Sequence, residues 1–389
     1  MINQLTKLVA IGIGIVVVAL AIVLLVTQTK KESGVIKPEV IKPEVIKIGA
    51  ILPLTGEMAS HGEDAKKGIE LAVEIKNKLG GIRNKKILVI YEDDKMQPQD
   101  GVAAFRKLIT INKVPVVLGG IGSSVALAIT PIAEKEKVVF ISPTASSPKL
   151  TAAGVYIFRN WPSDIFEGGE MAKASIETLG MKNVAVLYVN NDFGRGIKEV
   201  FRKKFEEFGG EVLIEETYEQ GTNDFKSQLT KIKNKNPEAI YLPGYYQEVA
   251  RILKQAKEMG IQARFLSTTP IENPKLIELA GNAAEGVIYT RPAFDPANPD
   301  ENYKKLASSF KVKYGVEPGI AAAFSYDAMN IILLSIEKGG LIGSGIQKAM
   351  AGIKDFPGVT GDISFDENGD VIKEMMLFTV KNGQFIPFR

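Results

Sequence analysis

The chain contains 389 residues, of which 45% are hydrophobic and 24% are charged, with no cysteine and one histidine. This is the composition of a globular protein of roughly two or three domains, and it excludes disulfides, thiolate zinc sites, iron–sulfur clusters and any site built on two imidazoles. The net charge of +3, from 48 basic and 45 acidic residues, is too balanced for a nucleic-acid-binding protein. We therefore expect no nucleic-acid partner.

The N-terminal segment contains an uncharged apolar run from Leu8 to Val26. As a helix this run is about 28 Å long, close to the hydrocarbon thickness of a membrane. A cleaved signal peptide has a shorter apolar core and a small-residue cleavage site, so the pattern favours a transmembrane anchor within residues 1–30 over a cleaved signal. Because no cysteine follows the run, a lipoprotein anchor is excluded. Residues 31–45 form a Pro/Lys/Glu linker with the repeated unit VIKPE, whose prolines keep it extended.

From residue 46 onward, short apolar runs alternate with amphipathic stretches. Continuous β-branched runs are typical of parallel strands buried on both faces, and the stretches between them have helical spacing. Two successive series predict two doubly wound α/β sheets, because parallel strands require helical crossovers. The predicted strands are Ile46–Leu52, Ile87–Tyr91, Val114–Leu118 and Val138–Ile141 in the first series, and Val184–Val189, Val212–Thr217, Ala239–Leu242 and Arg264–Leu266 in the second.

The C-terminal part has a different pattern. Two helical patterns, at 299–314 and 320–338, precede Asn-Gly pairs at Asn368-Gly369 and Asn382-Gly383. Asn-Gly between apolar runs predicts a hairpin turn. The acidic segment at 366–370 is interpreted as such a turn rather than as a calcium loop, because Val371 stands where a calcium loop requires glycine.

The loops after the predicted strands supply glycines, small hydroxyl residues and aromatics, which suit reversible binding rather than bond cleavage. Ligands of doubly wound sheets bind at these strand ends. In the segment GGIGSS at 119–124, Ser123 or Ser124 is expected to be the N-cap of a helix whose free N–H groups can hold a carboxylate. The segment lacks a dinucleotide fingerprint and a phosphate-binding lysine. His61, in a Gly-flanked polar loop, is interpreted as a residue on the rim of a cleft and not as a general base.

Several motifs resemble the leucine/isoleucine/valine-binding-protein family, the type I extracytoplasmic solute receptors of ABC importers. The motifs, in register over residues 46–389, include IKIGAILPLTGEMASHGEDAKKGIELAVEIKN, VVLGGIGSSVALAITPIAEKEKVVFISPTASSPKLT, FRNWPSD, YVNNDFGRG and AEGVIYTRP. The resemblance implies a periplasmic-binding-protein type I fold with two Rossmann-like doubly wound lobes. It places residues 46–161 and 293–373 in the first lobe and residues 162–292 and 374–389 in the second, with crossovers near 160–163, 290–293 and 373–376.

The resemblance also implies a ligand site between the lobes. In this family a serine after the third strand holds the ligand carboxylate, and the matching residue is Ser123. Residues after the fourth strand bind the carboxylate and the amine, and they correspond to Thr144, Ala145 and Ser146.

The aromatic positions of the family also have counterparts. Those that close over the ligand from the second lobe match Phe193 and Tyr245. His61 falls where the family often has an aromatic residue near the pocket mouth. The resemblance therefore implies walls of mainly apolar character around the ligand.

One position departs from the family pattern. The acidic residue that neutralises the ligand amine falls at Thr269, and a threonine cannot neutralise an ammonium group. Glu272 lies close in sequence, but Asn273 and Pro274 have the pattern of an N-cap and first helical residue, so Glu272 is expected to lie outside the site. A ligand without an amine is therefore an alternative to an amino acid.

The predicted function is that of an extracytoplasmic solute receptor of an ABC importer, which binds branched-chain or other small apolar amino acids. We predict no enzymatic activity, no cofactor and no metal. The expected partners are the small-molecule ligand, an ABC transporter permease and the cell membrane, through Leu8–Val26, with the globular part outside. Two alternatives are a receptor for a small organic or aromatic acid or amide lacking an amine, and a membrane-tethered ligand sensor.

Overall fold

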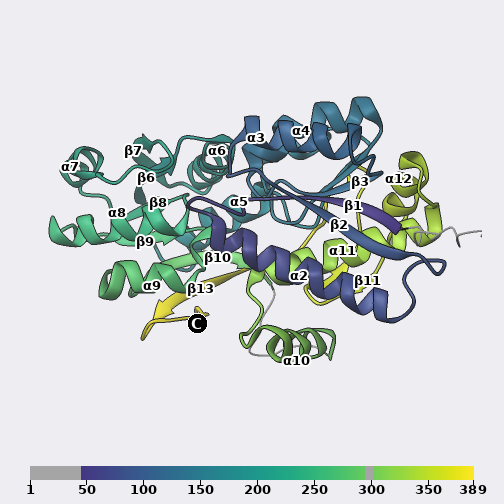
Figure 1. The fold of residues 1–389 in the computed structure, drawn as a ribbon. Coiled ribbons are helices and arrows are strands. Elements are labelled where there is room, and N and C mark those ends of the chain that lie inside the picture. The colour runs from purple at the N-terminus through teal and green to yellow at the C-terminus, as the bar shows by residue number, and fades with distance from the viewer. Residues whose placement is uncertain (1–44, 294–300) are drawn as a thin grey trace, which may run out of the picture. The chain divides into compact units, whose positions relative to one another are not determined.

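The computed structural model describes residues 45–293 and 301–389; the predicted anchor Leu8–Val26 and nearly all of the linker lie outside them. The described residues form a five-stranded sheet, a seven-stranded sheet and a small two-stranded sheet (Figure 1). The five-stranded sheet with its helices is termed the first lobe, and the seven-stranded sheet with its helices the second lobe. The prediction of two doubly wound α/β lobes is confirmed.

The first sheet has the strand order β2-β1-β3-β4-β5, and all neighbouring strands in it are parallel. Strands β3 and β4 are entirely buried, as expected for a parallel sheet covered on both faces. The predicted runs overlap β1 to β4, whereas β5 was not predicted, because so short a strand shows no periodicity. The strands are β1 (Val45–Leu52), β2 (Lys86–Asp93), β3 (Val116–Gly119), β4 (Val139–Ser142) and β5 (Ile157–Arg159).

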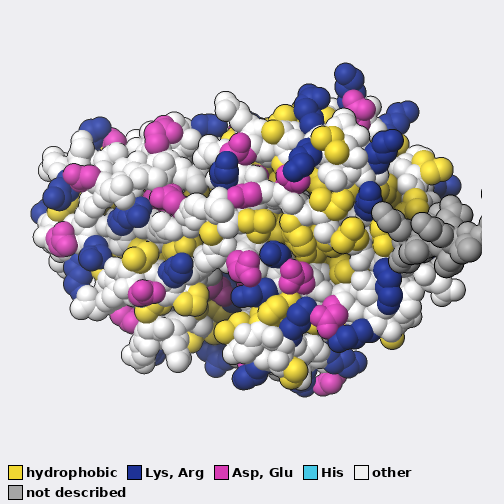
Figure 2. Space-filling model, viewed as in Figure 1, with side chains coloured by type: hydrophobic (Ala, Val, Ile, Leu, Met, Phe, Trp, Pro, Cys, Tyr) yellow, Lys and Arg dark blue, Asp and Glu magenta, His cyan; other side chains and the backbone are white. Residues whose placement is uncertain are grey.

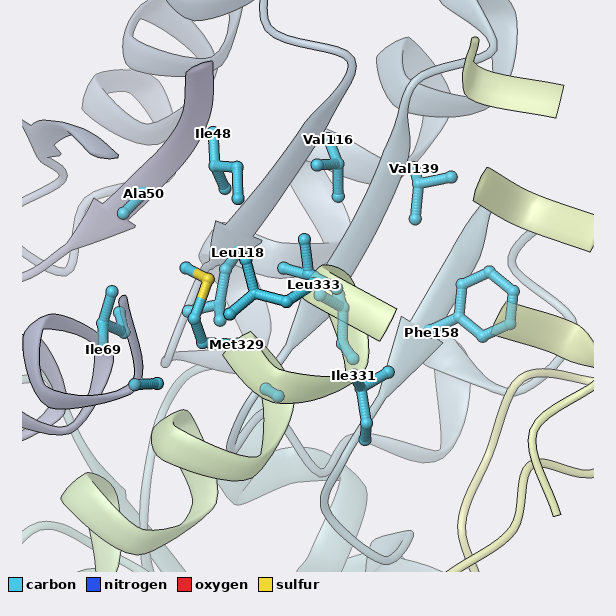
Figure 3. Packing of buried hydrophobic residues seen from close by; sticks show 14 of the residues in the cluster. Ile48, Ala50, Ile69, Val116, Leu118, Val139, Phe158, Met329, Ile331 and Leu333 are labelled. Atoms are coloured by element: carbon cyan, nitrogen blue, oxygen red, sulfur yellow. The ribbon is translucent and has the colours of Figure 1, made fainter. Parts of the chain in front are cut away.

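Helices cover both faces of the first sheet. Figure 3 shows one face, where Ile48 and Leu118 of the strands lie toward Met329 and Leu333 of α11. Helix α2 packs closely against α11 at Gly68. A Cβ at this position would lie 2.2 Å from the Ala322 carbonyl oxygen, so the contact requires glycine. The helices of this face are α2 (Ala59–Lys78), α11 (Ile320–Gly339) and α12 (Gly343–Ala351), and those of the other face are α3 (Pro98–Thr110) and α4 (Ser123–Glu136).

Helix α11 is the central helix of the first lobe. By length and composition it could cross a membrane, but most of its surface is buried within the lobe. Phe324, Met329 and Ile332 on this helix have no exposed surface. We therefore interpret α11 as a core helix. Helix α10 (Glu301–Tyr314) contacts α2 from outside this core.

The second sheet has the strand order β14-β13-β10-β9-β8-β6-β7. Strands β6 to β10 are parallel, and β13 and β14 add an antiparallel edge. Helices α5 (Asp164–Glu177) and α6 (Asp192–Glu207) supply one hydrophobic layer, and α7 (Lys226–Lys235), α8 (Tyr246–Glu258) and α9 (Pro274–Ala280) supply the other. The strands are β6 (Asn183–Val189), β7 (Glu211–Tyr218), β8 (Ala239–Leu242), β9 (Arg264–Ser267), β10 (Ile288–Pro292), β13 (Met375–Lys381) and β14 (Gln384–Pro387).

The two Asn-Gly pairs have different outcomes. Asn382-Gly383 joins β13 to β14, so the predicted hairpin is confirmed. Asn368-Gly369 is a turn, as predicted, but a single antiparallel bridge flanks it instead of two strands. Asp366 Oδ1 closes this turn by accepting hydrogen bonds from the backbone N–H groups of Asn368 at 2.8 Å and Asp370 at 2.9 Å.

A buried ion pair lies where the chain leaves the first sheet. Arg159, at the end of β5, donates from Nε to Asp370 Oδ1 at 2.6 Å, and its Nη1 donates to the carbonyl oxygens of Ser146 at 3.0 Å and Ser147 at 2.9 Å. Both charged side chains are almost fully buried. The guanidinium therefore joins β5, the loop after β4 and the turn that precedes β13.

Charged side chains of both signs are interspersed over the face drawn in Figure 2.

The chain passes between the two lobes after β5, after β10, and between β12 (Gly361–Ile363) and β13. Strand β12 pairs with β11 (Phe356–Gly358) in the small sheet.

Candidate functional site

A cavity lies between the two lobes, at the carboxyl ends of the strands of both sheets. The cavity is small, with a volume of about 60 Å³, and it is partly open to solvent. All but one of the predicted site residues line it. The lining residues are Met58, His61, Met96, Ile121, Gly122, Ser123, Thr144, Ser146, Trp161, Glu167, Phe193, Tyr245, Thr269, Pro270, Ile320 and Ala321.

The N-terminus of α4 forms one wall. The prediction that Ser123 or Ser124 is the N-cap is wrong: Gly122 occupies this position in extended geometry, and Ser123 is the first helical residue. The Ser123 hydroxyl oxygen instead accepts hydrogen bonds from the backbone N–H groups of Ser146 at 3.3 Å and Ser147 at 3.1 Å. Because the first N–H groups of a helix have no partner within it, this end of α4 suits a carboxylate.

The loop after β4 contributes to the same wall. Thr144 Oγ1 donates a hydrogen bond to the Ile121 carbonyl oxygen at 3.3 Å, which holds this loop beside the one after β3. Thr144 and Ser146 line the cavity, whereas Ala145 does not. The Ala145 side chain belongs to the hydrophobic cluster of the first lobe, and its N–H donates to Ser142 Oγ at 3.0 Å.

Aromatic side chains form the apolar walls. Phe193 and Tyr245, from the starts of α6 and α8, stack with ring centroids 5.8 Å apart. Asn191 Nδ2 donates to Tyr245 Oη at 3.1 Å and fixes the orientation of that ring. From the segment after β5, Trp161 packs against Phe324 with centroids 4.5 Å apart.

His61 lies in the first turn of α2, so its placement in a loop was wrong. The misleading residue was Gly62: a Cβ there would lie 2.0 Å from the Pro53 carbonyl oxygen, so this glycine permits a close approach rather than ending a helix. The imidazole is half-buried and stacks on Tyr246 with centroids 5.4 Å apart. Burial lowers the pKa of His61 to about 4, so the ring is neutral at neutral pH.

Glu167 of α5 is the site residue that sequence reasoning missed. It is the only carboxylate among the described residues that line the cavity. Its Oε1 accepts a hydrogen bond from the Thr269 backbone N–H at 2.9 Å. A signal was available: Glu167, Met171 and Ser175 recur at four-residue spacing on the buried face of the helix, where a glutamate is unusual.

Glu272 lies outside the cavity lining, as expected. Asn273 caps α9 by accepting a hydrogen bond from the Lys275 N–H at 2.9 Å, and Pro274 is the first helical residue. The Glu272 carboxylate pairs with Arg291 Nη1 at 2.7 Å and therefore already has a cation.

Hydrogen bonds join the lobes beside the cavity. Ser124 Oγ donates to Asp192 Oδ2 at 2.9 Å and accepts from the Asp192 N–H at 3.0 Å, and Lys149 Nζ lies 3.0 Å from Asp192 Oδ1. On another side, Tyr246 Oη donates to the Glu57 carbonyl oxygen at 3.1 Å. The lobes are therefore in contact around the space in which a ligand would lie.

Two α/β lobes with a small cavity between them define a solute-binding protein of the two-lobed type. Residues 45–384 match the family model described as periplasmic binding protein, and the chain belongs to this family. Over 327 residues it is 32% identical to the leucine-, isoleucine-, valine-, threonine- and alanine-binding protein of Pseudomonas aeruginosa, a match that covers 84% of this chain and 87% of that protein.

Solved structures agree with this assignment. The leucine-binding protein LivK of Thermotoga maritima is 32% identical, with a TM-score of 0.84 and coverage of 89% of this chain and 98% of that one. The substrate-binding protein LivJ of a branched-chain amino acid transporter from Streptococcus pneumoniae, in complex with isoleucine, is 31% identical, with a TM-score of 0.82 and coverage of 88% and 98%.

The only tryptophan of the chain provides a direct signal for binding. Because Trp161 lines the cavity, we expect saturating L-leucine to change its fluorescence intensity or emission maximum. The measurement is a fluorescence titration, with Trp161→Phe as the blank. An unchanged spectrum at a concentration where calorimetry shows saturation would place the ligand elsewhere.

Proposed function

We propose that this protein is the extracytoplasmic solute-binding receptor of an ABC importer and that it binds a branched-chain or other small apolar amino acid. The observation that carries the proposal is the cavity between the lobes, with the N-terminus of α4 and the Ser123 hydroxyl at one wall and apolar side chains at the others. The wall at the N-terminus of α4 suits a carboxylate, and the apolar walls suit an aliphatic side chain. The names of the relatives support the same class of ligand.

Ligand capture would act through the equilibrium between open and closed lobes. A ligand that contacts both lobes stabilises the closed form, and a permease that recognises this form receives only loaded receptor. We propose that the hinge lies in the crossovers near 160–163, 290–293 and 373–376, and that Leu8–Val26 holds the protein at the outer face of the membrane. An acid or amide without an amine is the competing ligand class, because Thr269 carries no charge.

A thermal-shift panel tests the proposal on the full-length chain in detergent. Branched-chain amino acids at 100 times their dissociation constants should raise the free energy of unfolding by about 2.7 kcal/mol. Lysine and glutamate serve as controls, because Glu167 is the one Asp, Glu, Lys or Arg among the described residues that line the cavity. If no amino acid and no small carboxylic acid shifts the melting temperature, the receptor function is wrong.

A further inference from the structure

The Glu167 side chain is held at the boundary between the lobes. Its residue is 1% exposed, and Oε1 accepts hydrogen bonds from the Thr269 N–H at 2.9 Å and from Thr290 Oγ1 at 3.1 Å. Thr269 Oγ1 lies 3.0 Å from the same oxygen. Thr269 thus carries no charge itself, but its hydrogen bonds position the carboxyl group of Glu167 from α5.

No ion pair involves Glu167 among residues 45–293 and 301–389. The two buried arginines of this region are engaged, Arg159 with Asp370 and Arg291 with Glu272. An ionised carboxylate that is buried without a cation is costly, so the cavity favours a ligand that supplies a positive charge.

The other ionisable groups near Glu167 do not supply that charge. Asp164, one turn earlier on α5, is fully buried, and burial together with the neighbouring Glu167 raises its pKa well above the ordinary value, so it is held in its neutral form. From β8, Tyr241 faces both carboxyl groups as a neutral phenol, and the cavity imidazole of His61 is neutral. Burial raises the pKa of Glu167 to about 7.

The cavity thus combines a wall that suits a carboxylate with one buried carboxylate of its own. We infer that Glu167 binds the ammonium group of the ligand, in place of an acidic residue at position 269, so that the receptor selects α-amino acids over acids of the same shape. The inference rests on the proposed function and deepens it, because it decides between its two ligand classes. The carboxylate wall alone would accept either class.

Calorimetry with a matched ligand pair tests this role. L-leucine and 4-methylpentanoate share the carboxylate and the aliphatic chain and differ by the amine. We expect wild-type protein to prefer leucine, and Glu167→Gln to weaken leucine binding at least about 100-fold while changing 4-methylpentanoate binding by less than about 3-fold. Glu170→Gln, on the same helix but outside the lining, is the control and should bind leucine as wild type does.

Proton release provides a second readout that a purely structural role would not change. Burial raises the pKa of Glu167, and an ammonium group beside it lowers that pKa, so leucine binding near pH 7 should release a fraction of a proton. Calorimetry in two buffers of different ionisation enthalpy measures this number in the wild type, even if Glu167→Gln fails to fold. The release should disappear in Glu167→Gln and persist in Glu170→Gln.

The possible outcomes separate the two levels of the proposal. Equal affinity of the wild type for both ligands, proton release that persists in Glu167→Gln, or tight leucine binding by folded Glu167→Gln would each overturn the role of Glu167 and leave the receptor function intact. Failure of the wild type to bind any amino acid or small carboxylate would overturn the receptor function itself.

Discussion

Replacing Arg159 with methionine is expected to lower the free energy of unfolding by about 3–5 kcal/mol. The substitution removes the cation from a buried pair and leaves Asp370, which is 7% exposed, without its partner. It also removes the donors to the Ser146 and Ser147 carbonyl oxygens. Urea denaturation of the ligand-free protein, followed by circular dichroism, measures the change.

Two further variants separate the charge effect from lost packing. Arg159→Met combined with Asp370→Asn should recover part of the stability, because no unpaired charge is then buried. Lys204→Met removes a cation from the exposed pair with Glu207, and its urea midpoint should stay close to that of the wild type, because exposed pairs are screened by solvent. A loss below 1 kcal/mol for Arg159→Met would show that the pair contributes no more than a surface one.

Replacing Tyr245 with alanine is expected to weaken L-leucine binding by about 10- to 150-fold, the equivalent of about 1.5–3 kcal/mol. The ring forms part of the cavity wall and stacks on Phe193, so alanine removes an apolar surface from contact with the ligand. Isothermal calorimetry measures the affinity, and the melting temperature without ligand shows whether the lobe is intact.

Tyr245→Phe is the matched control. It keeps the ring and loses only the hydroxyl that accepts the hydrogen bond from Asn191, so we expect its leucine affinity to fall by less than about 10-fold. If the phenylalanine variant were as weak as the alanine variant, the hydroxyl rather than the aromatic wall would determine affinity.

The fold was predictable because its signals are local. Apolar β-branched runs and helical spacing are visible in the sequence, and they located β1 to β4 and β6 to β9. The turn at Asn382-Gly383 was equally clear. Strand β5 was not, because its three residues form a strand only through pairing with β4. Its pairing depends on the tertiary structure.

The site was predictable where a residue follows a strand. Ser123, Thr144, Phe193 and Tyr245 all lie in such positions, and all line the cavity. Glu167 lies inside a helix, and it reaches Thr269 across a separation of 102 residues only because α5 packs against β10. The sequence shows that position 269 lacks the acidic residue of the family. It does not show that the carboxyl group of Glu167 lies beside Thr269 in the fold.

The hydrogen bonds between the lobes have a consequence for residence time. Ser124 with Asp192, and Tyr246 with Glu57, bind the lobes together beside the cavity. Opening the lobes to release a ligand breaks these contacts as well as those of the ligand, so they are expected to slow its dissociation. These contacts add the same cost of opening for every ligand, and a partner that pulls the lobes apart would break them together with the contacts of the ligand.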